Sequence, residues 1–143
     1  MAIEIKIPTL DFEKDVAIGL DLPLSNFKGS GFALNYTTLD QAVANAKVLL
    51  LTNHGERPMR PTFGCNLRNT LFENSGVELQ STVEETIRDN FNVYLPYINI
   101  NELQVQTPTL EPNRLDITLT ISLRGNETQT RQIDLQVESE SEV

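Results

Sequence analysis

Hydrophobic residues occupy every second position over much of the last third of the chain. The longest such run comprises Leu115, Ile117, Leu119, Ile121 and Leu123. Because successive side chains of a strand point to opposite faces, this run predicts a strand with one apolar and one polar face. Leu103 and Val105 show the same alternation, and it returns at 133–137 after a polar turn at 124–127. We therefore predict a three-stranded antiparallel meander whose apolar face is covered by helices.

The segment 81–95 has a helical period instead. Its apolar side chains recur at Val83, Ile87, Phe91 and Tyr94. This spacing places them on one face of an amphipathic helix. Ser81 and Glu84 have the spacing of a capping box, which predicts the start of the helix, and Pro96 predicts its end. We expect this helix to cover the apolar face of the sheet.

Two shorter helical segments precede it. The sequence TLDQAVANAK at 38–47 is rich in helix formers, and Thr38 and Gln41 have the spacing of a capping box. The four apolar residues at 48–51 fit either the end of this helix or a buried strand, and periodicity does not decide between the two. One or two further helical turns are expected in LRNTLFEN, with three side chains facing inward: Leu67, Leu71 and Phe72.

The N-terminal part of the chain is predicted to form an arm. The alternation in IEIKIP at 3–8 predicts a short strand, whereas the glycines and prolines within 19–36 favour an extended or looped segment. We predict an α+β fold, with two or three helices packed on a C-terminal antiparallel sheet. Its parts are an extended N-terminal arm at 1–37, a single domain at 38–137 and an acidic tail at 138–143.

A sheet of this kind has at least one free edge, where the backbone N–H and C=O groups on the outer side of a strand are unpaired. Segments 115–123 and 131–137 are the strongest candidates, although the alternation does not say which of them is outermost. A long alternating edge is a template for a strand from another chain, and IEIKIP is the type of segment that could be added.

Composition narrows the classes of function. The chain has 143 residues, one cysteine, one histidine and a formal net charge of -9. We therefore expect one domain with no disulfide, metal site or cofactor. No run of five basic residues occurs, and the net charge is negative, which argues against nucleic acid and anionic membranes as partners. The N-terminal segment does not resemble a secretory signal and no segment approaches the ~18 apolar residues of a membrane span, so we expect a soluble chain folded in the cytosol.

The densest cluster of unusual residues is HGERPMRPTFG at 54–64. Arg57 and Arg60 each precede a proline, which favours an extended backbone and holds their guanidinium groups on a stiff segment. These groups could bind a carboxylate of a neighbouring subunit bidentately. Alternatively, Arg57 pairs with Glu56 or another internal acid, and the prolines only shape a turn.

No residue is predicted to be catalytic. His54 has no orienting partner in the sequence, and Cys65 is expected to be a small buried residue. Glycoside hydrolysis would need one carboxyl group of raised pKa and a second carboxylate across the sugar. Capping explains Glu84, and Arg57 would lower rather than raise the pKa of Glu56. The sequence therefore predicts a protein that is not an enzyme.

The same cluster carries a resemblance to a known family. The motif G-E-R-P-M-R-P-x-F-G-C at 55–65, followed by Leu71, Phe72 and Glu73 and by a capped helix, resembles the baseplate wedge protein of contractile-tailed bacteriophages. This is the gene-twenty-five family, which also occurs in type VI secretion and related contractile injection systems. The resemblance covers roughly residues 38–137. Members typically carry Glu-Pro-Arg just after the long helix, where this chain has Leu95, Pro96 and Tyr97.

The resemblance implies a structural subunit of a tail baseplate wedge that starts assembly of the contractile sheath by offering a sheet edge for strand addition. It implies other wedge subunits, hub or tube proteins and the tail sheath protein as partners, and a place in the virion after assembly in the host cytoplasm. The expected partner interface comprises Glu56, Arg57, Arg60, Phe63, Leu95 and Tyr97. An apolar contact through the last two would replace the family's charged pair. The family has also been described as an acidic lysozyme, so peptidoglycan hydrolysis is the alternative function.

Overall fold

The computed structural model describes residues 15–22, 24, 31–73, 77–108 and 114–138. In chain order the elements are β1 (Gly19–Leu20), β2 (Leu34–Asn35), α1 (Thr38–Leu51), α2 (Leu67–Glu73), α3 (Val77–Tyr94), β3 (Ile98–Gln106), β4 (Arg114–Leu123) and β5 (Asn126–Glu138). The predicted strand at 3–8 and all but the first residue of the predicted acidic tail lie outside the described residues.

Strands β3, β4 and β5 form an antiparallel sheet in that order, which confirms the predicted meander. At its centre Leu119 pairs with Leu103 on one side and Ile133 on the other, and all three side chains are buried. The prediction of an edge strand was right for 131–137, which lies in β5, and wrong for 115–123, because β4 is the central strand. The other edge is β3, whose pairing with β4 shifts register between Ile100 and Glu102.

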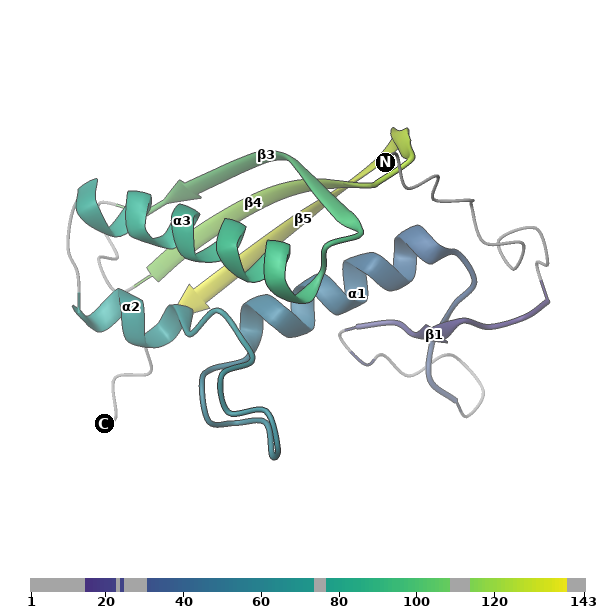
Figure 1. Ribbon diagram of the computed structural model, residues 1–143, viewed down its shortest axis with the longest axis horizontal. Coiled ribbons are helices and arrows are strands. Elements are labelled where there is room, and N and C mark those ends of the chain that lie inside the picture. The colour runs from purple at the N-terminus through teal and green to yellow at the C-terminus, as the bar shows by residue number, and fades with distance from the viewer. Residues whose placement is uncertain (1–14, 23, 25–30, 74–76, 109–113, 139–143) are drawn as a thin grey trace.

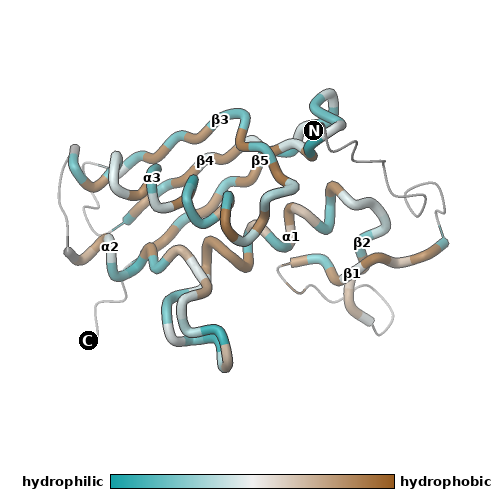
Figure 2. Tube along the Cα trace, in the orientation of Figure 1, coloured by the Kyte–Doolittle hydropathy of each residue, from teal (hydrophilic) through white to brown (hydrophobic). Residues whose placement is uncertain are grey.

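All three helices lie on the same face of this sheet (Figure 1), where α3 packs against β3 and α1 packs against β4 and β5. Figure 2 shows the hydrophobic positions alternating with hydrophilic ones along the strands. The largest fully buried side chains come from both layers and include Leu49, Leu50, Leu67, Ile87, Leu115, Ile117, Leu119, Ile121 and Ile133. Each such side chain stabilises the fold by about 1.5–3 kcal/mol on burial. Most of them are residues that the helical and strand periodicities predict to face inward.

Helix α1 continues to Leu51, so the apolar run 48–51 is the end of a helix and not a strand. Its two inner members, Leu49 and Leu50, are buried, whereas Val48 and Leu51 are exposed. This pattern is that of a helix turning with about 3.6 residues per turn, because a run of four then covers all sides.

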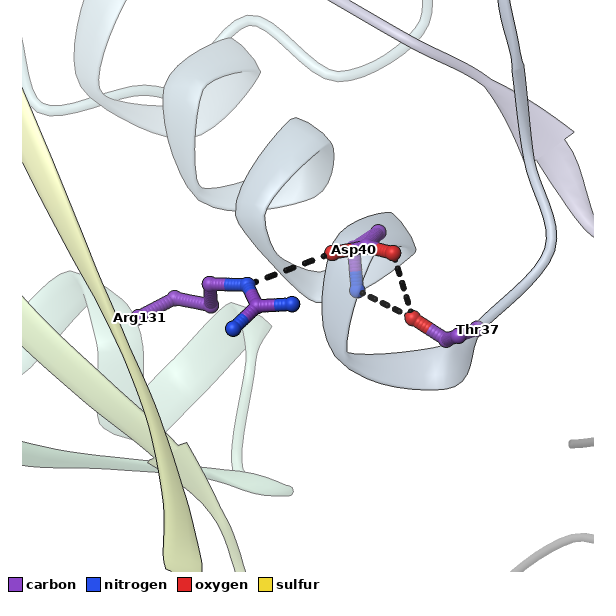
Figure 3. A network of polar contacts seen from close by, with 3 residues as sticks. All are labelled: Thr37, Asp40 and Arg131. Carbon is purple, nitrogen blue, oxygen red and sulfur yellow. Dashed lines mark hydrogen bonds and ion pairs between the residues drawn. The ribbon is translucent and has the colours of Figure 1, made fainter.

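The N-cap of α1 is Thr37, one residue before the predicted Thr38. The hydroxyl group of Thr37 accepts a hydrogen bond from the backbone N–H of Asp40 at 3.1 Å and donates one to the Asp40 carboxylate at 2.7 Å (Figure 3). The same carboxylate accepts from the guanidinium of Arg131 in β5 at 3.4 Å. Asp40 therefore ties the start of the helix to the edge strand, although an ion pair this exposed adds little stability.

Helix α3 begins at Val77, so the prediction of a start at Ser81 was wrong. The Ser81 hydroxyl donates to the backbone carbonyl of Glu78 at 3.0 Å, which is the bond that a serine inside a helix makes with the preceding turn. The predicted inward face is confirmed for Val83, Ile87 and Phe91, which are buried, whereas its fourth member, Tyr94, is half-buried.

Helix α2 confirms Leu67 and Leu71 as inward residues and corrects Phe72, whose side chain is 67% exposed. Residues four apart share a helix face, and the next residue is turned about 100° away from it. Phe72 therefore faces solvent in this structure.

The described part of the arm is attached to α1. Strands β1 and β2 pair with each other, and the side-chain amide of the buried Asn35 donates to the Leu20 carbonyl at 3.0 Å and to Gln41 of α1 at 3.2 Å. Lys47 of α1 donates to the Leu22 carbonyl at 2.7 Å. The Lys47 bond places Leu22 beside the C-terminal half of α1.

Candidate interaction surfaces

The segment between α1 and α2 projects from the body as a narrow loop that doubles back on itself (Figure 1), and we call residues 53–64 the arginine loop. It is closed by the N–H of Gly55, which donates to the Pro61 carbonyl at 2.8 Å. At its tip the N–H of Arg60 donates to the Arg57 carbonyl at 3.2 Å, which completes a four-residue turn with Pro58 in its second position. Met59 takes the third position with a φ of 68°.

The loop is fixed at its base to α3. Phe63 is buried, and its ring packs edge-on against Tyr94 with the centroids 5.1 Å apart. The Tyr94 hydroxyl donates to the Thr62 carbonyl at 3.0 Å. The arginine loop is therefore supported by side chains of a helix far away in the sequence.

Glu56 serves the loop internally. Its carboxylate accepts hydrogen bonds from the backbone N–H of Asn53 at 2.9 Å and from the Asn53 side-chain amide at 2.8 Å. These bonds stabilise the ionised form and hold the pKa of Glu56 below its ordinary value. A general acid needs the opposite shift, so this carboxyl group is unsuited to that role.

Arg57 and Arg60 are exposed, and within the described part of the chain neither forms an ion pair. The Arg57 guanidinium instead lies over the Phe63 ring, 4.5 Å from its centroid. Arg57 therefore makes a cation–π contact within the chain. The alternative hypothesis, an ion pair between Arg57 and Glu56, is not observed among the described residues. Glu56, Arg57, Arg60 and Phe63 are thus brought together on one loop.

Leu95 and Tyr97 lie just after the C-terminal end of α3, and the two side chains differ in burial. Leu95 is packed in the core and is only 7% exposed. Tyr97 is half-buried, and its hydroxyl accepts a hydrogen bond from the side-chain amide of Asn45 in α1 at 2.9 Å. Both side chains therefore support the packing of this chain on itself, and their part in a partner interface stays a prediction.

Strand β5, which forms one edge of the sheet among the described residues, borders a surface that the sequence did not reveal. A groove of about 490 Å³ runs between β5 and the C-terminal half of α1 and is lined by Leu22, Lys47, Val48, Leu51, Thr52, Asp134 and Leu135. We call it the β5 groove. Its apolar wall comes from Val48 and Leu51, the two outward members of the 48–51 run, which a helical reading of that run would have marked as exposed.

Among the described residues no group of three or more His, Cys, Asp or Glu side chains could hold a metal ion. Cys65 is buried, and desolvation raises the pKa of its thiol to about 12, so it stays protonated at neutral pH and is a poor nucleophile. None of the helices in this part of the chain has the length and hydrophobicity that crossing a membrane requires.

Comparison with known proteins identifies the relatives of this chain. Residues 38–128 match the family described as baseplate wedge protein gp25. The chain is 33% identical over 96 residues to baseplate wedge protein gp25 of Enterobacteria phage T4, a match that covers 66% of this chain and 71% of that protein.

Two solved structures share the fold. A putative tail lysozyme from Geobacter sulfurreducens aligns with a TM-score of 0.61 at 18% identity, over 72% of this chain and 92% of that one. A chain of the anti-feeding prophage baseplate aligns with a TM-score of 0.60 at 24% identity, over 73% of this chain and 82% of that one. At these identities the likeness establishes the architecture alone.

Proposed function

The chain belongs to the baseplate wedge protein gp25 family, and from that membership we propose that it is a structural subunit that starts assembly of the contractile sheath on a tail baseplate. Its place would be the baseplate of the virion tail, after assembly in the host cytoplasm. The observation that carries the initiating role is the position of β5 at an edge of the sheet, as far as the described residues form it, beside an apolar groove.

Strand addition at β5 would use both features together. Among the described residues β5, which is 13 residues long, pairs only with β4, so the backbone N–H and C=O groups directed away from β4 are available to an added antiparallel or parallel strand. Alternate side chains of that strand would then point toward the layer in which α1 lies. There they would contact Val48, Leu51 and Leu135, which line the groove. Backbone bonds would give the joint its strength, and the β5 groove would choose the partner's side chains.

The second edge, β3, is less suited to this role. It is shorter, with nine residues against 13, and its register shift near Asn101 lies within the strand, whereas the register shift between β4 and β5 lies at the turn end of that pair, between Ser122 and Leu123. Irregularities of this type protect sheet edges from pairing with other chains. We therefore assign the sheath-initiating joint to β5.

The arginine loop would make a separate contact with another wedge subunit or with a hub or tube protein. Arg57 and Arg60 present positive charge on a chain whose net charge is -9, so the loop fits an acidic surface, whereas the rest of the chain fits basic ones. Arg60 would bind a carboxylate directly, and Glu56 and Phe63 would hold the loop in shape. Leu95 and Tyr97 would contribute only if the interface reaches the end of α3.

We propose a structural and not an enzymatic role. The name tail lysozyme belongs to a structure that is 18% identical and shares the fold. Sustained release of reducing sugar from peptidoglycan by the purified chain, lost on changing one glutamate, would contradict this part of the proposal.

Leu51→Glu tests the sheath-initiating joint. Leu51 is 51% exposed, so a carboxylate there remains solvated in the free chain but would be buried beneath an added strand. We expect normal folding and normal incorporation into baseplates, with the number of sheathed baseplates at least about tenfold lower by electron microscopy. Hydrogen exchange should show that β5 amides gain protection when the cognate sheath protein binds the wild-type chain.

Val93→Glu is the matched control. Val93 is 70% exposed on α3, away from the groove, and receives the same charge. Equal sheath assembly by the Leu51 and Val93 variants would overturn the assignment of the joint to the β5 groove.

A further inference from the structure

Met59, at the tip of the arginine loop, is 98% exposed, more than any other large hydrophobic side chain in the described residues. A single exposed apolar residue is ordinary on a protein surface. Its backbone makes Met59 unusual, because a φ of 68° is the left-handed conformation that favours glycine or asparagine and costs other residues about 1–2 kcal/mol. The chain therefore holds an apolar side chain where neither water nor the backbone favours it.

The loop beneath Met59 is organised before any partner arrives. The Gly55–Pro61 hydrogen bond closes the loop, and the hydrogen bonds from Asn53 to Glu56 fix its N-terminal side. The Arg57 guanidinium stacks on the Phe63 ring. A side chain presented on a rigid support loses less entropy on binding than one on a loose segment. The tip thus has the design of a contact point and not of a connecting turn.

The chemistry around the tip indicates what it would contact. The Met side chain is flexible and polarizable and fits irregular apolar pockets, and Met and Arg are enriched at the centres of protein interfaces. Arg60 stands next to Met59, is exposed and makes no ion pair among the residues that the structure describes. A complementary site would be an apolar socket with carboxylates at its rim.

We propose that Met59 is an anchor that inserts into such an acidic-rimmed socket on another protein subunit of the baseplate. This inference rests on the proposed function, which supplies the assembly, and adds to it the residue that makes the contact and the chemistry of the site that receives it. Arg60 pairs with the rim and sets the orientation, while the Met59 side chain fills the socket.

Competitive incorporation tests the anchor. Wild-type chain and Met59→Gly would be co-expressed with the remaining baseplate proteins, and their ratio in purified baseplates measured by mass spectrometry. Glycine relieves the backbone cost, so the free variant should melt at the same temperature or higher. Its share of the baseplates should fall about 10- to 100-fold, as the loss of one buried apolar side chain predicts.

Val93→Ala, which trims another exposed apolar side chain, should be incorporated as well as the wild type. Equal incorporation of Met59→Gly would overturn the anchor while leaving the family role intact, whereas absence of the wild-type chain from baseplates would overturn the proposed function itself. A photo-crosslinking amino acid at position 59 should react with a peptide of another baseplate protein that contains carboxylates. Crosslinks only to nucleic acid or to a second copy of this chain would also contradict the proposal.

Discussion

At the scale of single residues, the arginine loop depends on backbone conformations that side chains disfavour. Gly64 has a φ of 114°, and a Cβ added there would meet the carbonyl oxygen of Thr52 well inside van der Waals distance. Gly55 also has a positive φ, of 86°, but a Cβ added there would have no atom within 4 Å. Gly55 is therefore required only by its backbone conformation, whereas Gly64 is required both by its conformation and by the lack of space for a side chain.

We predict that Gly64→Ala lowers the free energy of unfolding by about 2–4 kcal/mol, because it adds a steric clash to the cost of a left-handed alanine. Gly55→Ala should lose only about 1 kcal/mol. Urea denaturation of both variants, followed by circular dichroism, checks the difference. Equal losses would mean that the backbone near Thr52 yields to the added methyl group and that the close approach has no structural importance.

Residue-level expectations failed where two local solutions competed. Thr37 with Asp40 and Thr38 with Gln41 both have capping spacing, and the structure uses the first, in which Asp40 also reaches Arg131 from β5. That second contact joins residues 91 positions apart in the sequence, so no local pattern could reveal it. The predicted loop residues Glu56, Arg57, Arg60 and Phe63 do lie together, whereas the contacts that hold them come from Asn53 and Tyr94.

At the scale of elements, strong periodicity predicted which segments form strands and helices. It predicted less well which strand lies at the edge of the sheet and where each helix begins. Alternation in β3, β4 and β5 identified all three strands, because one face of the sheet is buried under helices. The order of the strands was not encoded in that alternation, since a central and an edge strand carry the same pattern on their inner faces. The β5 groove was missed because it requires α1 and β5 to lie side by side.

Leu119→Pro tests the position of β4. Every amide of a central strand is directed to one neighbour or the other, so a proline at Leu119 removes a ladder hydrogen bond and strains a fully buried site. We predict that the variant fails to fold, with loss of the cooperative thermal transition and of β-sheet circular dichroism. A variant that folds and supports normal particles would contradict the placement of Leu119 in the interior of the sheet.

At the scale of the whole molecule, two surfaces of different chemistry lie on different elements. The β5 groove is apolar and borders an open edge, whereas the arginine loop is basic and projects away from the body (Figure 1). With a net charge of -9, the chain can attract basic partners over most of its surface and an acidic one only where its arginines gather. A subunit with two such surfaces is suited to joining two different neighbours.

The arginine pair should matter more for assembly than for folding. In the free chain Arg57 contributes only an exposed cation–π contact, worth about 0.5–1 kcal/mol, and Arg60 has no ion pair among the described residues. We therefore predict that Arg57→Ala combined with Arg60→Ala lowers the free energy of unfolding by no more than about 1 kcal/mol and reduces incorporation into baseplates at least about tenfold. Thermal denaturation and quantitative mass spectrometry of baseplates give the two numbers.

Arg88→Ala combined with Arg124→Ala is the control, since it removes the same charge from α3 and from the turn between β4 and β5. If general electrostatic attraction drives assembly, both double variants should lose incorporation equally, and more so at low salt. If the arginine loop makes a specific contact, only the first pair should lose it. In the wild type, raising the ionic strength from 0.05 to about 0.5 M should weaken the loop's contact and should leave the apolar joint at β5 unaffected, because only charge pairs are screened by salt.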